Sequence, residues 1–148
     1  MKTKVLAFIA FLIATSSVVA NNLVVCNEAT NTRIGLGQTI VIQNFYFDVG
    51  KSDITPRLQR YLAQRAAELR GLDYQQITII GHTDNTGSID SNIKLSYMRA
   101  RNVAMVLINN DIDRARVVYK GFGPNTPIAS NTTEEGRQAN RRVEISVD

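Results

Sequence analysis

The sequence predicts an α+β fold, a two-layer sandwich in the order β-α-β-α-β-β, with two helices packed on one mixed sheet. Three observations support this fold class. Residues 77–80 form a short apolar run rich in β-branched side chains, as strands do. Apolar residues recur at helical spacing over 93–108. Near the end of the chain, apolar and polar residues alternate over 142–147, which predicts a strand with one buried face.

The first twenty residues have the pattern of a secretory signal peptide. Basic residues precede an apolar run, and small side chains favour cleavage after Ala20. The alternative is an uncleaved membrane anchor, but the run is short of the roughly 20 apolar residues that a spanning helix needs. We therefore expect an exported protein in which a lead-in segment, residues 21–38, precedes one domain over residues 39–148.

The composition limits the classes of function. The chain of 148 residues is 44% hydrophobic and 20% charged, as expected for one globular domain. Its formal net charge is +4, and removal of Lys2 and Lys4 leaves 15 basic residues against 13 acidic ones, or +2. This charge is too small to indicate a nucleic-acid partner.

Cys26 lies in the lead-in segment, just after a short strand expected at residues 23–25. It is the only cysteine, so no internal disulfide can form. Lipid attachment is disfavoured because Val25, rather than a small residue, precedes the cysteine. Lipidation, a free thiol and an intermolecular disulfide all stay open from the sequence.

The domain is expected to begin with a β-branched and aromatic strand at 39–47. Thr55 and Pro56 then predict a helix start, with Thr55 as the N-cap and Pro56 at the first helical position, where its missing N–H costs nothing. Gly71 ends this helix. Its apolar residues at helical spacing are Leu58, Tyr61, Leu62, Ala66 and Leu69.

The second helix is expected to bury an apolar face on the sheet and to end at Asn109. Its expected buried residues are Tyr97, Ala100, Val103, Ala104 and Leu107. A third strand follows at 116–120, and a rigid turn at 121–124. Thr133 is the expected cap of one helical turn over 133–138, before the last strand.

A polar loop joins the strand at 77–80 to the second helix. Gly81 and Gly87 permit backbone angles or close approaches that a Cβ would forbid. The polar residues between these two glycines can cap, turn or bind a ligand. We therefore expect the loop to hold a fixed shape.

The second helix carries a polar stripe, because Asn92, Ser96 and Arg99 are spaced i, i+4, i+7. If the helix packs beside the preceding strand, Arg99 can face Asp84 of the loop. A pocket with these two charges suits a zwitterion such as an amino-acid head group, since the carboxylate takes an ammonium and arginine grips a carboxylate. The alternative is a salt bridge between the two side chains that pins the helix to the loop.

The tetrapeptide Gly81-His82-Thr83-Asp84 opens a series of motifs that resembles the OmpA-like C-terminal domain. The series continues with Gly87, Asn92, Leu95, Ser96, Arg99, Ala100, Gly121, Gly123, Pro127 and Asn140-Arg141-Arg142-Val143. The resemblance covers nearly everything from Ile40 to the end. It implies a periplasmic domain, associated with the cell wall or outer membrane, that binds peptidoglycan without cleaving it. It further implies recognition of the diaminopimelate residue of the stem peptide, which would anchor an envelope component to the cell wall.

Carried over position by position, the resemblance implies a ligand-binding site. Its residues are Asp48, Asp84, Thr86, Asn92, Leu95, Arg99 and Arg141. In this assignment Asp84 holds the diaminopimelate ammonium and Arg99 holds its carboxylate. Thr86 and Asn92 add neutral hydrogen bonds.

Asp48 and Arg141 could have a structural role instead of a role in ligand binding. Arg142 is not assigned to the site. Asp48 could merely cap the turn after the first strand. Arg141 could pair with Glu134 or Glu135 instead of reaching a carboxylate of the stem peptide. Arg142 is expected on the solvent face of the last strand.

No catalytic or metal centre is expected. His82 is the only histidine and no serine stands on a nucleophile elbow, so a hydrolase is disfavoured. His82 is expected to fix the strand end by a hydrogen bond. One histidine and one distant cysteine do not supply a zinc site, and nothing requires a cofactor.

A second hypothesis belongs to another class of function. The protein could be an envelope assembly protein whose pocket is not used and whose residues 21–38 dock on an outer-membrane or envelope-complex partner. The sequence leaves the partner and the oligomeric state open.

Overall fold

The computed structural model describes residues 19–20, 23–26, 35–43 and 50–148. The centre of the sheet has the strand order β3-β6-β4-β5. These strands are β3 (Gln38–Gln43), β4 (Ile77–His82), β5 (Val117–Gly123) and β6 (Arg142–Val147). Strand β6 runs antiparallel to β3 and β4, whereas β4 and β5 are parallel, so the sheet is mixed. Two short strands, β1 (Val19–Ala20) and β2 (Leu23–Cys26), extend the sheet beyond β3.

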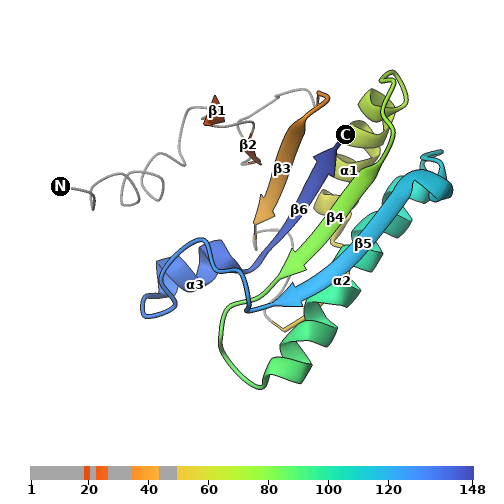
Figure 1. Ribbon diagram of the computed structural model, residues 1–148. Coiled ribbons are helices and arrows are strands. Elements are labelled where there is room, and N and C mark those ends of the chain that lie inside the picture. The colour runs from red at the N-terminus through yellow and green to blue at the C-terminus, as the bar shows by residue number, and fades with distance from the viewer. Residues whose placement is uncertain (1–18, 21–22, 27–34, 44–49) are drawn as a thin grey trace.

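Two long helices cover one face of this sheet, as Figure 1 shows. They are α1 (Pro56–Leu69) and α2 (Ile89–Asn109). A shorter third helix, α3 (Glu134–Asn140), lies at the end of the sheet where β6 begins, and a 3₁₀ turn, η3 (Arg114–Arg116), precedes β5. The predicted α+β class is confirmed, with the two predicted long helices and with α3 where the sequence predicts one helical turn. The predicted strand at 39–47 is described only as far as Gln43, and the predicted signal peptide lies outside the described residues except for Val19 and Ala20.

Helix α1 begins where the sequence predicts. The Oγ1 of Thr55 accepts a hydrogen bond from the backbone N–H of Leu58 at 3.2 Å, and Pro56 occupies the first turn. Helix α3 begins in the same way, because Thr133 Oγ1 accepts from the N–H of Gly136 at 3.1 Å. The predicted helical turn at 133–138 therefore exists and continues to Asn140.

Helix α2 begins one turn earlier than predicted. Ser88 is its N-cap, with its Oγ accepting from the N–H of Ser91 at 3.2 Å, and Asp90 adds a negative charge that suits the first turn. This first turn is polar apart from Ile89, which is exposed, so apolar periodicity did not reveal it.

The hydrophobic core lies between the sheet and the two long helices. The alternation predicted for β6 is confirmed, because Val143, Ile145 and Val147 are all buried in this core. The prediction that Tyr97 is buried is wrong, since this residue is 41% exposed. Its ring lies beside that of Tyr119 on β5, with 5.6 Å between the centroids, rather than inside the core.

Two glycines allow the backbone of α2 to lie directly on the strands. A Cβ at Gly81 of β4 would collide with the carbonyl oxygen of Ser96, and one at Gly121 of β5 would collide with the backbone nitrogen of Tyr97. The close approach predicted at Gly81 is therefore confirmed. It fixes the first turns of α2 relative to the ends of β4 and β5.

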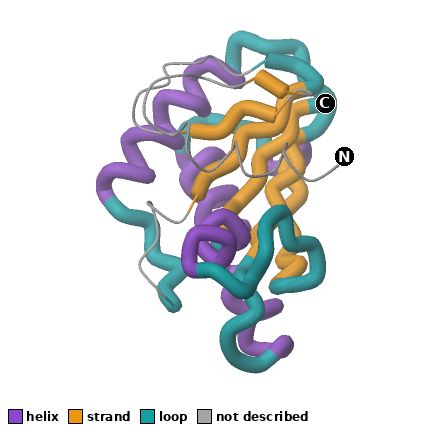
Figure 2. Tube along the Cα trace, turned by 90° about the vertical axis from the view of Figure 1, so that its left-hand side faces the viewer, coloured by secondary structure: helices purple, strands orange, loops and turns teal. Residues whose placement is uncertain are grey.

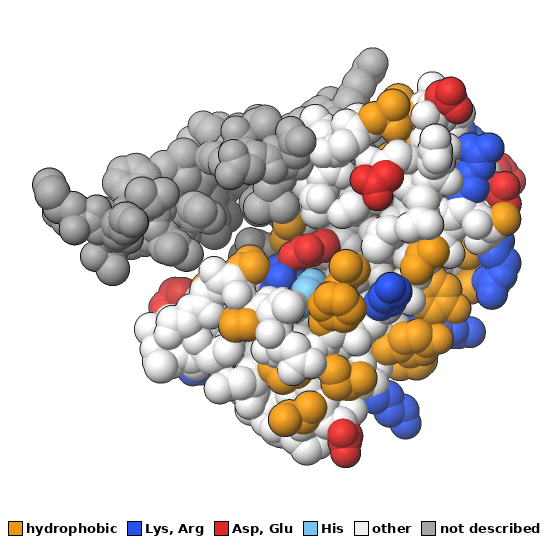
Figure 3. All heavy atoms as spheres, in the orientation of Figure 1, with side chains coloured by type: hydrophobic (Ala, Val, Ile, Leu, Met, Phe, Trp, Pro, Cys, Tyr) orange, Lys and Arg blue, Asp and Glu red, His pale blue; other side chains and the backbone are white. Residues whose placement is uncertain are grey.

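The opposite face of the sheet is not covered by α1 or α2. Hydrophobic side chains gather over β4 and β5 on this face, as Figure 3 shows. Strand alternation places half-buried Ile80, Val118 and Phe122 there, because Ile79 and Tyr119 pack on the core and Gly121 contacts α2. Arg142 lies on this face, but the expectation that it faces solvent is wrong, because it is 3% exposed. Its Nε donates to Glu144 Oε1 at 2.7 Å, and its Nη2 donates to the carbonyl oxygen of Thr126 at 3.2 Å.

The loops at the lower end of the sheet in Figures 1 and 2 gather beside α3. The carboxyl ends of β3, β4 and β5 and the amino end of β6 all lie there, because β6 is antiparallel to β3 and β4. Among the helices of the described ranges, none has both the length and the apolar character needed to cross a membrane.

Candidate functional site

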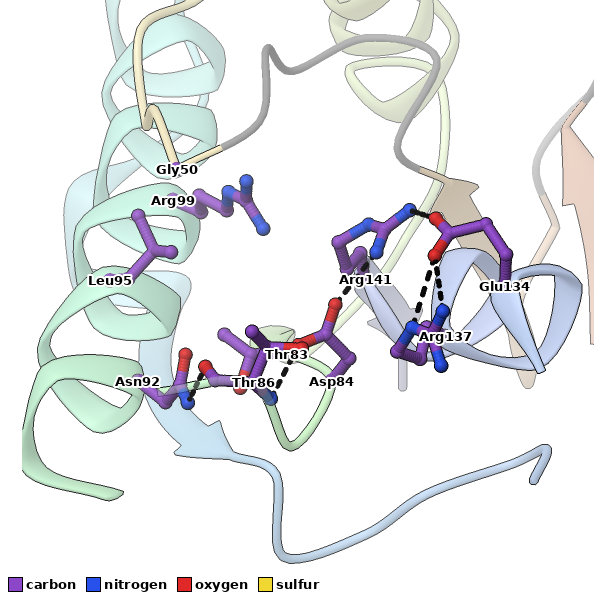
Figure 4. Close-up of a pocket in the computed structure, with 10 residues that line it drawn as sticks. All are labelled: Gly50, Thr83, Asp84, Thr86, Asn92, Leu95, Arg99, Glu134, Arg137 and Arg141. Carbon is purple, nitrogen blue, oxygen red and sulfur yellow. Dashed lines mark hydrogen bonds and ion pairs between the residues drawn. The ribbon is translucent and has the colours of Figure 1, made fainter. Parts of the chain in front are cut away.

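A pocket of about 550 Å³ opens at this end of the sheet (Figure 4). Its lining residues are Gly50, Thr83, Asp84, Thr86, Asn92, Leu95, Arg99, Glu134, Arg137 and Arg141. Six of the seven predicted site residues therefore lie in one place. The seventh, Asp48, lies outside the described residues.

Asp84 lies in the loop that follows β4, and it is buried. Its Oδ1 accepts from the backbone N–H of Thr86 at 2.8 Å, which fixes the shape of the loop, and its Oδ2 accepts from Arg141 Nη1 at 2.7 Å. Burial by itself would raise the pKa of this carboxyl, but the hydrogen bonds from Arg141 and Thr86 outweigh it and hold the pKa below its usual value. Asp84 is thus ionised at neutral pH.

Asn92 ties this loop to the first turns of α2. Its Nδ2 donates to the carbonyl oxygen of Thr86 at 2.8 Å. Ser96, which the sequence places on the same stripe, does not line the pocket. Its buried hydroxyl donates to the carbonyl of Ile93 at 2.8 Å and accepts from the N–H of Gly123 at 2.9 Å, so it fixes the end of β5.

Arg99 forms the cationic wall of the pocket on the α2 side, beside Leu95 (Figure 4). Its side chain is 1% exposed, and its Nε donates to the carbonyl oxygen of Lys51 at 2.9 Å. Burial and the nearby charge of Arg141 lower the pKa of Arg99 to about 10, against the opposing effect of Asp84. The guanidinium is therefore still charged at neutral pH.

Arg141 reaches the pocket from the opposite side, where α3 ends and β6 is about to begin. Its Nη1 donates to Asp84, and its Nη2 donates to Glu134 Oε1 at 2.7 Å. Burial alone would lower the pKa of Arg141, but the two carboxylates outweigh it and raise the pKa. The predicted alternative of a pair with Glu134 is thus present together with a pair to the site carboxylate.

The sequence predicts that Arg99 can face Asp84, but the two side chains, both described in the structure, do not form an ion pair. Both side chains line the same pocket, but the ion-pair partner of Asp84 within the described residues is Arg141. The register of β4 and β6, in which Gly81 lies opposite Val143, brings Arg141 to the Asp84 loop. Local spacing along one helix cannot reveal a partner on another strand.

Four lining residues were not predicted for the site, namely Gly50, Thr83, Glu134 and Arg137. Arg137 Nε and Nη2 donate to Glu134 Oε2 at 3.0 and 2.8 Å. Their i, i+3 spacing on a helix predicts this pair but not its position at the pocket. The hydroxyl of Thr83 is buried without a hydrogen-bond partner among the described atoms, a rare situation for a buried polar group.

His82 lies beneath the loop, at the end of β4. Its Nδ1 and the hydroxyl of Thr126 are 2.9 Å apart, so the predicted hydrogen bond at the strand end is confirmed. Burial and the charge of Arg142 lower the pKa of His82 to about 4, and Glu144, whose Oε1 is 3.7 Å from Nε2, opposes this shift. His82 is neutral at pH 7. Within the described residues no group of three or more His, Cys, Asp or Glu side chains is placed to hold a metal ion.

The fold and the pocket together define an α+β domain with a charged pocket at one end of its sheet. The family comparison agrees with this class, because the model of the OmpA family matches residues 46–141. The chain belongs to the OmpA family.

Known relatives share this domain. Outer membrane protein A of Bordetella avium is 42% identical over 102 residues, covering 69% of this chain and 53% of that protein. The probable lipoprotein YiaD of Escherichia coli (strain K12) is 39% identical over 114 residues, covering 75% and 52%. Peptidoglycan-binding protein ArfA of Mycobacterium tuberculosis (strain ATCC 25618 / H37Rv) is 41% identical over 97 residues, covering 66% and 30%. The chain spans about half the length of the first two relatives and less of the third.

Solved structures of the same fold include the cell wall anchor of the T6SS from Pseudomonas aeruginosa, with a TM-score of 0.67 and 32% identity over 74% of this chain and 79% of that one. The periplasmic domain of Helicobacter pylori MotB has a TM-score of 0.68 and 26% identity, covering 78% and 80%. The peptidoglycan-associated lipoprotein from Burkholderia pseudomallei has a TM-score of 0.64 and 27% identity, covering 70% and 87%.

Proposed function

We propose that this protein binds peptidoglycan without cleaving it and anchors an envelope component to the cell wall. Membership of the OmpA family supports the proposal, as do relatives that are named as a peptidoglycan-binding protein, a cell wall anchor and a peptidoglycan-associated lipoprotein. The signal-peptide pattern of residues 1–20 supports export to the periplasm, where the cell wall lies.

The proposed ligand group is the diaminopimelate residue of the stem peptide. The observation that carries this proposal is the convergence of an ionised Asp84 and a buried, charged Arg99 on one pocket. The free end of diaminopimelate is a zwitterion, so its ammonium pairs with Asp84 and its carboxylate with Arg99. Asn92 and Thr86 supply neutral hydrogen bonds and keep the loop in place.

Leu95 contributes an apolar surface to the same pocket, next to Arg99 (Figure 4). The side chain of diaminopimelate carries methylene groups between its two charged ends. We propose that Leu95 packs against these methylenes. Asp48, which the family resemblance also assigns to the site, is proposed as a further contact.

The sharpest test compares two ligands that differ in one charged group. Isothermal titration calorimetry would measure the affinity of the protein, purified from the periplasm of an expressing bacterium, for stem peptides that contain either diaminopimelate or lysine. Lysine keeps the ammonium but lacks the carboxylate. We expect the lysine peptide to bind on the order of a hundredfold more weakly, because Arg99 then lies buried without its ligand carboxylate. Equal affinities, or no binding of either peptide, would contradict the proposal.

The second hypothesis, in which residues 21–38 dock on an envelope partner, has no comparable observation in its favour. Residues 23–26 of that segment pair with β3 as strand β2, which uses their backbone inside the sheet. Peptidoglycan binding is therefore the function that the structure supports better.

A further inference from the structure

Glu134 lies between two arginines at the rim of the pocket (Figure 4). Its Oε1 accepts from Arg141 Nη2 at 2.7 Å, and its Oε2 accepts from Arg137 Nη2 at 2.8 Å and Nε at 3.0 Å. Arg141 in turn donates to Asp84, so four side chains form a row of alternating charge. The row leads from the interior of the pocket to its outer edge.

The two carboxylates that share Arg141 differ in how firmly they are held. The Asp84 side chain is 9% exposed, and a hydrogen bond from the N–H of Thr86 fixes it to the backbone of its own loop. Glu134 accepts three hydrogen bonds, but all of them come from side chains. The Glu134 side chain is 56% exposed and belongs to the first turn of α3. Ion pairs of such exposed carboxylates contribute little net free energy, because water solvates the separated charges well. Glu134 is therefore the carboxylate that another anion can replace.

Arg141 keeps its ion pair with Asp84 when Glu134 moves away, but its Nη2 loses Glu134 as an acceptor. The Arg141 side chain is only 12% exposed, so a replacement acceptor in that place is favourable. A ligand carboxylate that took the place of Glu134 would satisfy Arg141 and the nearby Arg137 together. Arg137 offers the replacing carboxylate two donors, Nε and Nη2, and Arg141 offers it one, Nη2, so the geometry suits such an exchange.

The family resemblance already implies that Arg141 reaches a carboxylate of the stem peptide. We propose that Arg137 joins Arg141 in an outer subsite for a second carboxylate of the ligand and that Glu134 is the internal competitor for this subsite. The inference rests on the proposed function. The second carboxylate belongs to the stem peptide outside the free end of diaminopimelate. Two groups have this chemistry, the α-carboxylate of the γ-linked glutamate that precedes diaminopimelate and the carboxylate at the end of the peptide.

This arrangement makes the pocket selective for the acidic stem peptide over an isolated diamino acid. A ligand that has only the zwitterionic end fills the inner part of the pocket, next to Asp84 and Arg99, and leaves Glu134 in place. A ligand with the second carboxylate gains contacts with Arg137 and Arg141 but must displace Glu134. Removal of the negative charge of Glu134 therefore strengthens binding of the second ligand only.

The test is a calorimetric titration of three peptides that contain diaminopimelate. One has every carboxylate free, one has the glutamate α-carboxylate as a carboxamide, and one has the terminal carboxylate as a carboxamide. The variants are Glu134→Gln and Arg137→Gln, with Glu135→Gln as the matched control, because Glu135 is an exposed neighbour that does not line the pocket.

We expect Glu134→Gln to bind the fully acidic peptide roughly twofold to fivefold more tightly, and Arg137→Gln to bind it more weakly by a similar factor. One of the two carboxamide peptides should respond to neither change, and it identifies the carboxylate that occupies the subsite. Glu135→Gln should match the parent with all three peptides. Arg137→Lys, which keeps the charge, should recover part of the loss if α3 is intact in Arg137→Gln.

Several results would overturn the inference while leaving the proposed function in place. Weaker binding by Glu134→Gln would mean that this carboxylate supports the ligand rather than competing with it. Identical responses of all three peptides would mean that no second carboxylate reaches the arginines. By contrast, a parent protein that binds none of the peptides would overturn the proposed function itself.

Discussion

Asp84 and Arg141 are 57 positions apart in the chain, yet Asp84 Oδ2 and Arg141 Nη1 lie 2.7 Å from each other. The antiparallel pairing of β4 with β6 produces this contact, because Gly81 lies opposite Val143 and the chain leaves β4 and enters β6 at the same end of the sheet. The pair gives the pocket a fixed negative charge beside a fixed positive one. Arg99 adds a positive charge on the α2 side of the same pocket, and the proposed ligand pairs its ammonium with Asp84 and its carboxylate with Arg99.

Replacement of Asp84 by asparagine tests the negative half of the pocket. The amide can still accept from the N–H of Thr86, so the loop should keep its shape, but the ligand ammonium loses its partner. We expect binding of the diaminopimelate peptide to weaken by about 2 to 5 kcal/mol, measured by calorimetry. Asp90→Asn, an exposed change in the first turn of α2, should bind as the parent does. Parental affinity in Asp84→Asn would show that Asp84 does not contact the ligand.

Replacement of Arg99 by lysine tests whether the guanidinium of the pocket binds the ligand carboxylate. Lysine keeps the charge but loses the planar pair of N–H donors and the hydrogen bond from Nε to the Lys51 carbonyl. We expect a loss of about 2 to 5 kcal/mol in binding of the diaminopimelate peptide. The lysine peptide, which lacks the carboxylate, should lose far less. Arg101→Lys, an exposed change on the same helix, is the control, and an equal loss for both peptides would argue against a carboxylate at Arg99.

The close contact of α2 with the sheet predicts a stability effect at Gly81. A Cβ there would meet the backbone of Ser96, which a helix cannot easily move. We expect Gly81→Ala to lower the free energy of unfolding by about 1 to 3 kcal/mol in urea denaturation. Gly71→Ala is the matched control, since a Cβ at that position meets only the carbonyl of Glu68 at 3.4 Å. Equal stability of the two variants would contradict the packing described for α2.

The burial of neutral His82 predicts acid sensitivity. Its pKa is lowered to about 4 in the folded protein from 6.5, so the unfolded chain binds a proton more readily than the folded one between these two values. The contribution of His82 to stability is fully present above pH 6.5 and is lost as the pH falls towards 4, on the order of 3 kcal/mol in total. Urea midpoints at several pH values would measure the loss. In His82→Asn the fall between pH 6.5 and 4 should be much smaller, and an unchanged fall would assign it to another group.

A second loss of stability is expected at lower pH, and it also occurs as the pH falls. The pKa of Asp84 lies below its usual value in the folded protein. Its contribution is present above the ordinary pKa of an aspartate and is lost as the pH falls through the lowered one. Binding of the ligand ammonium should disappear in the same range, because protonated Asp84 no longer attracts a cation.

Much of the fold could be predicted because its signals are local. The cap at Thr55, the proline after it and the alternation along β6 are short patterns that tertiary structure did not override. The start of α2 could not be found in this way, because a polar first turn has no apolar period. Tyr97 was misplaced because helical spacing does not show where the sheet ends, and its side chain lies near the edge strand β5.

The residues that line the pocket could be predicted better than the ion pairs that they form. Six of the residues implied by the family resemblance line one pocket, but the pairing of Arg141 with both Asp84 and Glu134 depends on the register of β6 and on the place of α3. Arg142 is likewise buried, and its Nη2 donates to the carbonyl oxygen of Thr126, which is 16 positions away in the sequence. Arg137 was not assigned to the site, because its spacing from Glu134 predicts only an ordinary helix pair.

The most direct test of the central claim is co-sedimentation with purified peptidoglycan sacculi that contain diaminopimelate. The parent protein should pellet with the sacculi, whereas Asp84→Asn and Arg99→Lys should stay largely in solution while keeping the circular dichroism of the folded parent. Asp90→Asn and Arg101→Lys should pellet like the parent. A folded parent protein that stays in solution, or site variants that pellet as fully as the parent, would contradict the claim that this pocket binds the cell wall.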